Sequence, residues 1–544
     1  MHISYFLINA TLALCSYASL LPNGPLQPRN LDARSQDPAE AIWKKLNGSE
    51  SLEWHDCYPG QKFHFECARF LVPLDYSKPI GSNNTASIAI IRIPSPYSSS
   101  SKEYKGPILF NPGGPGGSGV DFILTGGSLF RSILGNAFDI VGFDPRGMCL
   151  LNASYTHLTL LLIGVSRSLP VISFFKNDVD RNLWNAQTAR FSIVNTSTNS
   201  IPELVARSQV VGQLAEATNT NGYLQFINTE YTARDMLAHY QGAWKRQDPV
   251  LGILDNINRL IIDGVVDAEN YYATLWNKNL FDTEKVLDIF FESCFKAGPS
   301  RCAFYAPSPA AISQNLAKIY ESLSLAHFLR VSLFSSFYSP YALFPSVADA
   351  LAAFSRGDIE TTLDIADPTR QLTVGDISDA LVGIACNDGR PIPGTIEDTM
   401  SQDFLLWMAK PSIDIFRGPF VGNTSHPILL IGNTADPITP LIGAKKMAKG
   451  FLGSVVLTQD SAGHTSISGS SPCTMRYVRA YFENGTLPDA GTVCPVLAPP
   501  FIKPTKTASK RSDAQESHPI EEEDDAFINA VVELSKKRYI PIPF

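Results

Sequence analysis

Short apolar runs that end in glycine-rich or polar turns recur along this chain, and they predict the buried strands of a mostly parallel sheet. A ten-residue segment, IGAKKMAKGF (442–451), separates the last two runs and is typical of a connecting helix. The predicted strands lie in residues 63–72, 86–94, 107–110, 139–143, 259–266, 427–432 and 454–458. Strands joined through helices predict an α/β fold.

The densest turn signal is NPGGPGGSG (111–119), which directly follows the predicted strand PILF. Glycine permits positive φ and lets a ligand approach bare backbone N–H groups. N–H groups presented in this way can stabilise a developing oxyanion. Clusters of Gly and Pro also mark ordinary turns, so the loop alone leaves both interpretations open.

An acid and a histidine follow two successive predicted strands near the C-terminus. Asp436 lies in the loop after PILLIG, and His464 lies in the loop after SVVLT, 28 residues later. A Ser-Asp-His triad in α/β-hydrolase chain order has its acid and its base at such strand ends.

Five motifs together give a resemblance to a known family: NPGGPGGSG, GFDPRG (142–147), DGVVD (263–267), GNTADPITP (432–440) and GHTS (463–466). Their order resembles that of the secreted tripeptidyl-aminopeptidase-like α/β-hydrolases, in the proline iminopeptidase clan of serine exopeptidases. The segment ECARFLVPLDY (66–76) is also similar to that family, and the resemblance covers roughly residues 50–147 and 165–500.

The resemblance implies an α/β-hydrolase fold: a mostly parallel sheet with helices on both faces and a helical cap insertion. It also implies that Asp436 is the triad acid and His464 the base, with Gly114, or alternatively Gly113, donating to the oxyanion. No cofactor and no metal are implied.

The nucleophile is missing from this chain. An α/β-hydrolase carries it in a G-x-S-x-G elbow, and neither this motif nor its Cys or Asp version occurs anywhere in the sequence. The elbow belongs between TARDMLAHY (232–240) and RLIIDGVVD (259–267), where residues 232–260 contain no Ser and no Cys. Only 25 residues lie between Asp235 and Ile261, against roughly 35 for the missing elements. We infer a deletion near 240–258 of the strand and helix that carry the nucleophile.

A second departure follows GFDPRG, where residues 148–165 read as an insertion of foreign composition. Its apolar centre, LTLLLIGV (158–165), is too short to span a membrane. One insertion and one deletion with sharp edges suggest a retained intron and an over-spliced exon. A natural, degenerate hydrolase is the rival explanation.

The remaining chain divides by composition into a signal peptide (1–20), a core in two parts (51–267 and 421–500), a helical cap (268–420) and a charged tail (501–544). The aromatic segment 332–345 could line a substrate pocket, although core packing is its commoner use. The tail carries EEEDD (521–525) and two dibasic pairs, so we expect it to be solvated and disordered.

The charge argues against one class of partner, and the N-terminal segment indicates a secreted protein. The net charge is −8 without a basic stripe, which argues against nucleic acid as a partner. Of nine histidines only His464 lies in a motif, and His426 reads as a packing or surface residue. Residues 4–21 are apolar and precede a polar, Pro-rich segment, so a cleaved signal is favoured over a membrane anchor.

Eight cysteines remain after such cleavage, in an oxidising compartment. The pairs Cys57/Cys67, Cys294/Cys302 and Cys473/Cys494 are plausible disulfides, while Cys149 lies in the suspect insertion and Cys386 has no evident partner. Glycosylation sequons begin at Asn47, Asn83, Asn152, Asn195, Asn423 and Asn484.

The expected function is therefore a secreted serine hydrolase of peptidase type, which releases short peptides from a free N-terminus. We expect this exact chain to be inactive. An esterase or lipase of the same fold is one alternative. A catalytically dead hydrolase that binds a partner is the other. A peptide substrate is expected, and the sequence leaves residue preference and oligomeric state open.

Overall fold

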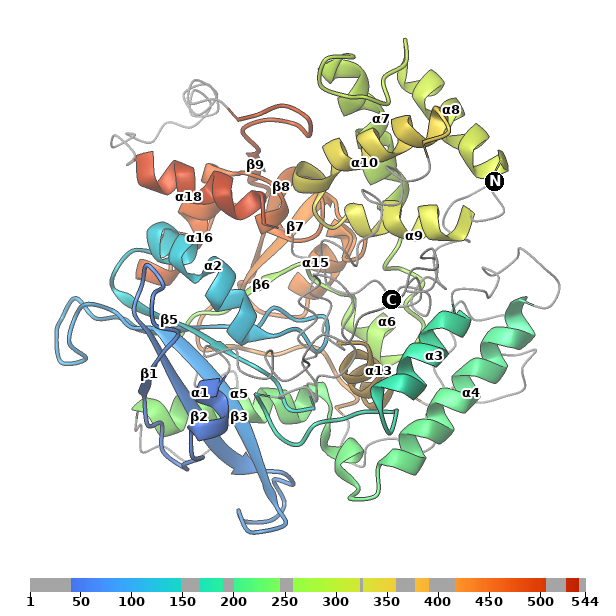
Figure 1. Ribbon diagram of the computed structural model, residues 1–544. Coiled ribbons are helices and arrows are strands. Elements are labelled where there is room, and N and C mark those ends of the chain that lie inside the picture. The colour runs from blue at the N-terminus through green and yellow to red at the C-terminus, as the bar shows by residue number, and fades with distance from the viewer. Residues whose placement is uncertain are drawn as a thin grey trace.

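A computed structural model describes residues 41–147, 167–188, 200–244, 258–322, 326–358, 377–390, 416–504 and 525–537 (Figure 1). The predicted signal peptide, the foreign segment 148–165 and most of the interval 240–258 lie outside the described residues. A short helix, α1 (Ala41–Lys45), precedes the first strand.

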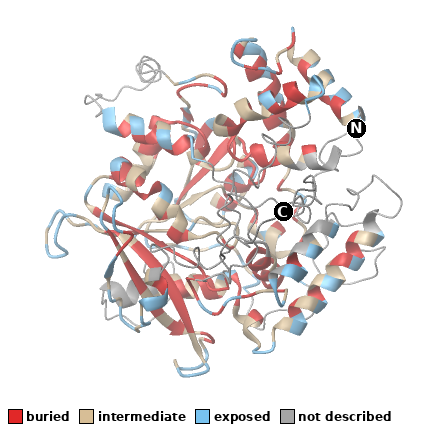
Figure 2. Cartoon of the chain, viewed as in Figure 1, coloured by how far each residue is buried: buried red, intermediate tan, exposed pale blue. Residues whose placement is uncertain are grey.

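The first sheet has five strands in the order β1-β2-β3-β5-β4. Their bounds are β1 (His55–Cys57), β2 (Phe65–Pro73), β3 (Thr85–Ile93), β4 (Gly106–Phe110) and β5 (Phe138–Phe143). The first three strands pair antiparallel, β3 pairs antiparallel with β5, and β4 runs parallel to β5. Every residue of β5 is buried, including Asp139, which fits the position of this strand inside the sheet (Figure 2).

The second sheet is entirely parallel, with the order β6-β7-β8-β9. Its strands are β6 (Ile261–Asp263), β7 (Leu429–Ala435), β8 (Val455–Ala462) and β9 (Val493–Pro495). Helix α15 (Leu441–Ala448) connects β7 to β8, so the strand–helix–strand unit predicted from the sequence is confirmed.

Among the described residues, β4 is the edge of the first sheet and β6 the edge of the second, and no described strand pairs with both. Helix α5 (Thr229–Trp244) and β6 are separated by sixteen residues, 245–260. A parallel strand with its return crossover needs a strand of about five residues and a connection of a dozen or more. The interval is short for both, and the deletion inferred from the sequence stays a prediction because residues 245–257 lie outside the described structure.

Helices on one face join the two half-sheets (Figure 1). Helix α2 (Gly119–Leu134) follows β4, and both α16 (Pro472–Asn484) and α18 (Asp525–Ser535) pack against it. Arg479 of α16 donates to the carbonyls of Ser132 and Ile133 at the end of α2, and its guanidinium lies 4.5 Å from the Phe527 ring centre. One apolar cluster therefore contains residues from both ends of the chain.

Helix α18 corrects the expectation of a disordered tail over 501–544. Phe527, Ala530, Val531 and Leu534 recur at helical spacing and are all buried in that shared cluster. The acidic run and the dibasic pairs dominate the local composition, but this apolar stripe gives residues 525–535 a packed face.

The segment predicted as a cap is mostly helical in its described residues, with turns between the helices. A buried aromatic cluster in it includes Phe334, Phe337 and Phe344, so these residues of the 332–345 segment serve core packing. The helices are α6 (Ala268–Tyr272), α7 (Thr283–Ala297), α8 (Pro309–Ser322), α9 (Ala326–Ser336), α10 (Pro340–Ser355) and α13 (Ile377–Asp388).

Residues between β5 and α5 also contribute to the helical region, although the sequence assigned them to the first part of the core. The helices here are α3 (Asp178–Thr188), α4 (Ser200–Thr218) and the 3₁₀ turn η4 (Tyr223–Phe226). Ala215 of α4 and Leu224 of η4 share an apolar cluster with Ile384 of α13. This cluster brings segments about 160 residues apart into contact.

All three predicted disulfides are present: Cys57–Cys67, Cys294–Cys302 and Cys473–Cys494. Among the described residues, Cys386 is buried and outside any disulfide. No described helix has the length and apolar content needed to cross a bilayer.

Candidate active site

Asp436 and His464 meet at the carboxyl ends of β7 and β8. The imidazole Nδ1 lies 3.1 Å from each carboxylate oxygen of Asp436. Parallel pairing of the two strands brings their following loops to one edge, although 28 residues separate the two positions. The Asp–His pair expected from the sequence thus has hydrogen-bonding geometry.

Asp436 is fully buried and is surrounded by donors. It accepts the backbone N–H groups of Ile438 (3.0 Å), Thr439 (2.8 Å) and Thr465 (3.1 Å), and the Thr439 hydroxyl (2.9 Å). Burial alone raises the pKa of this carboxyl, but the facing imidazole and the backbone donors outweigh burial and leave its pKa below the usual range. The carboxylate is therefore ionised and orients His464.

His464 is fixed from a second side by the cap. Its backbone N–H donates to the carbonyl of Tyr338 (3.1 Å), and the two rings meet edge to face with their centres 5.4 Å apart. Burial lowers the pKa of the imidazole, whereas Asp436 and then Asp263 raise it, and the net result lies above the usual value. Among the described residues, the hydrogen bonds of the imidazole ring are made by Nδ1. Nε2 can therefore face a substrate or a nucleophile.

Asp263, the last residue of β6, is a second acid at this edge, and our sequence analysis did not single it out. Its two oxygens accept the Ser466 N–H at 2.9 and 3.1 Å, and one also accepts the Ser466 hydroxyl at 2.6 Å. Removal from water raises the pKa of Asp263 to about 6, against the opposing effect of the Ser466 hydrogen bonds. Asp263 could have been identified from its position in DGVVD, because this motif lies at the end of a strand that runs parallel to β7.

The glycine loop lies between β4 and α2. Gly113, Gly114 and Gly116 all have positive φ, and the Gly117 N–H closes the turn on the Gly113 carbonyl at 2.7 Å. The Gly113 N–H donates to the Asn111 side chain at 3.1 Å. Among the described residues, no hydrogen bond connects this loop with His464.

The GFDPRG motif connects the first sheet to α5. Buried Arg146 makes a two-pronged ion pair with Asp235 of α5, at 2.8 and 2.6 Å, and also donates to the carbonyls of Leu74 and Pro73. Helix α5, the last described helix before β6, is therefore fixed to the sheet by Asp235, nine residues before the helix ends.

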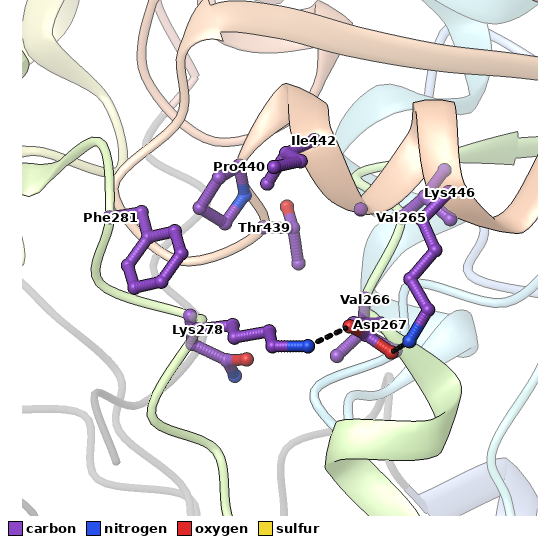
Figure 3. A pocket seen from close by; sticks show the side chains of 11 residues that line it. Val265, Val266, Asp267, Lys278, Phe281, Thr439, Pro440, Ile442 and Lys446 are labelled. Atoms are coloured by element: carbon purple, nitrogen blue, oxygen red, sulfur yellow. Dashed lines mark hydrogen bonds and ion pairs between the residues drawn. The ribbon is translucent and has the colours of Figure 1, made fainter.

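Thr439 also lines a small pocket of about 100 Å³ (Figure 3). Lys278 and Lys446 both bond Asp267, at 3.2 and 2.6 Å, and exposed Phe281 and Ile442 form its apolar rim. Thr439 belongs to both features, since its hydroxyl lies 3.0 Å from His464 Nδ1.

One group with metal-ligating side chains, Asp56, His64 and Glu66, lies on the surface of the first sheet. His64 is 3.3 and 3.6 Å from the two acids, and Arg92 bonds Glu66 at 2.6 Å. This is the arrangement of an exposed ion-pair network.

Comparison with known proteins finds one family model and several relatives with related names. A family model described as TAP-like protein matches residues 407–494, which contain Asp436 and His464. Serine protease Hip1 of Mycobacterium tuberculosis is 25% identical over 525 residues, covering 82% of this chain and 91% of the relative. Tripeptidyl aminopeptidase of Streptomyces lividans is 22% identical, with coverages of 82% and 87%. Carboxylesterase B of M. tuberculosis is 23% identical, with coverages of 89% and 97%.

These relatives are named as hydrolases, and the matched segment carries the Asp–His pair. The half-sheets, the connecting helices and the strand-end loops agree with the α/β-hydrolase fold expected from the sequence. The chain therefore has an α/β-hydrolase fold and is similar to TAP-like proteins over residues 407–494.

Proposed function

We propose that this protein derives from a secreted serine peptidase that releases short peptides from a free N-terminus, with Asp436 as the acid and His464 as the base. The observation that carries the proposal is the 3.1 Å contact of His464 Nδ1 with buried Asp436, beside the interrupted sheet position. A nucleophile strand in α/β-hydrolases ends at that position, next to the histidine loop.

In an intact enzyme, a serine hydroxyl oxygen would attack the scissile carbonyl carbon while His464 Nε2 takes the hydroxyl proton. The tetrahedral oxyanion would collapse, the C–N bond would break, and the imidazolium would return the proton to the leaving amine. Water would then hydrolyse the acyl-enzyme by the same route. Asp436 would hold the imidazole tautomer and stabilise its charge throughout.

The glycine loop supplies the proposed oxyanion donor. Gly114 is favoured over Gly113 because the Gly113 N–H is already bonded to the Asn111 side chain. Positive φ at both residues turns the backbone so that N–H groups can face one point.

Without a serine elbow, this exact chain should not turn over substrate. A binding role for a catalytically dead hydrolase is therefore the second candidate, favoured by the missing nucleophile. An esterase is the third, since one relative is named Carboxylesterase B.

A fluorophosphonate probe that labels active serine hydrolases tests the proposal. We expect no labelling of this chain, and labelling of a version in which a strand, a G-x-S-x-G elbow and a helix from a relative replace residues 245–257. Peptide amides with a free N-terminus should then be cleaved faster than short esters of matched size. Labelling of this chain itself, or no labelling of a folded restored protein, would refute the assignment.

Secretion and glycosylation are part of the same proposal. Three disulfides support an oxidising compartment, and Asn47, Asn83, Asn423 and Asn484 are exposed. Expression in a eukaryotic secretory host should give medium-borne protein whose mass falls on endoglycosidase treatment.

A further inference from the structure

Thr465, which follows His464, has an unusual backbone conformation. Its φ is 65° and its ψ is 166°, a region that residues other than glycine rarely occupy. A β-branched residue is strained there, so the surrounding structure has to stabilise the turn. The turn decides where the imidazole points, because His464 and Thr465 share a peptide bond.

Two carboxylates hold the two peptide groups that flank this turn. Asp436 accepts the Thr465 N–H, and Asp263 accepts the next N–H, that of Ser466, together with its hydroxyl. Hydrogen bonds to charged acceptors are roughly twice as strong as neutral ones. Two donors of Ser466 therefore hold Asp263: the backbone N–H, which is shared between both oxygens, and the hydroxyl. These bonds oppose the strain at Thr465.

The residue after Asp263 completes the arrangement. Gly264 has φ 73°, and a Cβ built on it would lie 2.7 Å from Thr465 Cγ2 and 3.0 Å from His464 Cε1. The end of β6 thus lies directly against the imidazole and the strained turn. Only a residue without a side chain fits there.

We propose that Asp263 is a positioning residue for His464, which acts by stabilising the strained turn at Thr465 through Ser466. This inference rests on the proposed role of His464 as the base, and it adds a second acid with a role different from that of Asp436. Asp436 contacts the imidazole itself, whereas Asp263 contacts only the backbone and side chain two residues further on.

The charged groups that face Asp263 are few among the described residues. His464 favours its ionised form, and Asp436 disfavours it. Asp263 in turn raises the pKa of His464. A change at position 263 therefore has an electrostatic effect as well as a positional one, and the experiment has to separate them.

The test observes the His464 Nδ1–H proton by NMR in the full chain at pH 8, where Asp263 is ionised, with His464→Ala to assign the signal. Asp263→Ala should lower that signal about fivefold or more, because the strain at Thr465 is no longer opposed. Thr465→Gly in the same chain removes the strain, so the double variant Asp263→Ala/Thr465→Gly should regain most of the signal. A purely electrostatic effect of Asp263 would not be restored by glycine.

Asp75 provides a matched control, because it accepts the N–H and the hydroxyl of Ser77 at 2.9 and 2.7 Å in the β2–β3 hairpin. Asp75→Asn should leave the His464 signal unchanged. Should Asp263→Ala not fold by circular dichroism, Ser466→Ala, which removes only the hydroxyl bond, should still weaken the signal.

An unchanged signal in a folded Asp263→Ala protein overturns the inference, as does a loss that Thr465→Gly does not restore. The readout requires no turnover, so it stands apart from the probe test of the proposed function. The NMR result can therefore be interpreted even if the protein does not hydrolyse any substrate.

Discussion

Asp436 and His464 could be placed from the sequence because each follows a clear apolar strand at the same edge of the sheet. Parallel pairing of β7 and β8 is enough to bring the two side chains within hydrogen-bond distance. Asp263 was harder to identify, because its motif marks the family without revealing its partner. The conformation of Thr465 could not be predicted, since a β-branched residue is a poor candidate for positive φ.

In the restored, active protein, Asp436→Asn or His464→Ala should each lower turnover by about 10⁴ or more with little change in folding. The physical reason is the loss of the oriented base. Turnover of a peptide amide at saturating substrate, with circular dichroism alongside, is the measurement.

Controls for this prediction come from the same region and from the other histidines. Asp460→Asn removes an exposed acid of β8 that bonds Thr434, and it should be near neutral, as should His426→Ala and His239→Ala. Equal losses at all positions would mean that the motif assignment does not discriminate.

Asp144 gives a pH prediction at the residue scale. Complete burial raises its pKa to about 6, although Arg167 and Ser118 partly oppose this, and its Oδ2 accepts no hydrogen bond. Because the folded pKa is above the unfolded one, the contribution of Asp144 to stability is greatest below about pH 4. It declines as pH rises from about 4 to 6, by about 3 kcal/mol in all.

The measurement is urea unfolding of the parent and of Asp144→Asn at several pH values. The difference in unfolding free energy should change across pH 4–6 and be flat from pH 7 to 8. A flat difference over the whole range would show that Asp144 ionises normally.

At the scale of elements, the sequence predicted the strands well, because apolar runs bounded by Gly, Pro and polar turns are strong local signals. It failed at α18, where a tail rich in charge contains an apolar stripe that only long-range packing reveals. The position of α3 and α4 beside α13 also depends on contacts between distant segments.

Leu534→Ala should destabilise the protein by about 2–5 kcal/mol, because it leaves a cavity in the cluster shared by α2, α16 and α18. Glu533→Ala, one residue earlier and exposed, should change stability by less than about 0.5 kcal/mol. Thermal or urea unfolding reports both. Equal, small effects would return residues 525–535 to the solvated tail that their composition suggested.

For the whole molecule, the interrupted sheet leads to a prediction about the gene. Decay by point substitution would usually leave the elbow in place with its serine replaced, whereas here the interval between α5 and β6 is too short for the elements. We therefore predict a messenger RNA that lacks most of codons 148–165 and carries extra codons between Tyr240 and Asn258.

The extra codons should encode an apolar strand and a G-x-S-x-G turn, with the new serine within hydrogen-bond reach of His464. Sequencing of the transcript from the source is the measurement. A transcript that matches this chain codon for codon would favour the dead hydrolase that binds a partner.

The packing of α18 on α2 has a consequence for the nascent chain. Helix α2 leaves the ribosome early, and its partner follows roughly 390 residues later. At translation rates of about 5–20 residues per second, this interval is on the order of 20–80 s. Throughout that time α18 is not available to pack against the apolar face of α2. The protein should therefore depend on chaperones during synthesis, and ribosome-bound chains stopped before Asp525 should bind them more strongly than full-length chains.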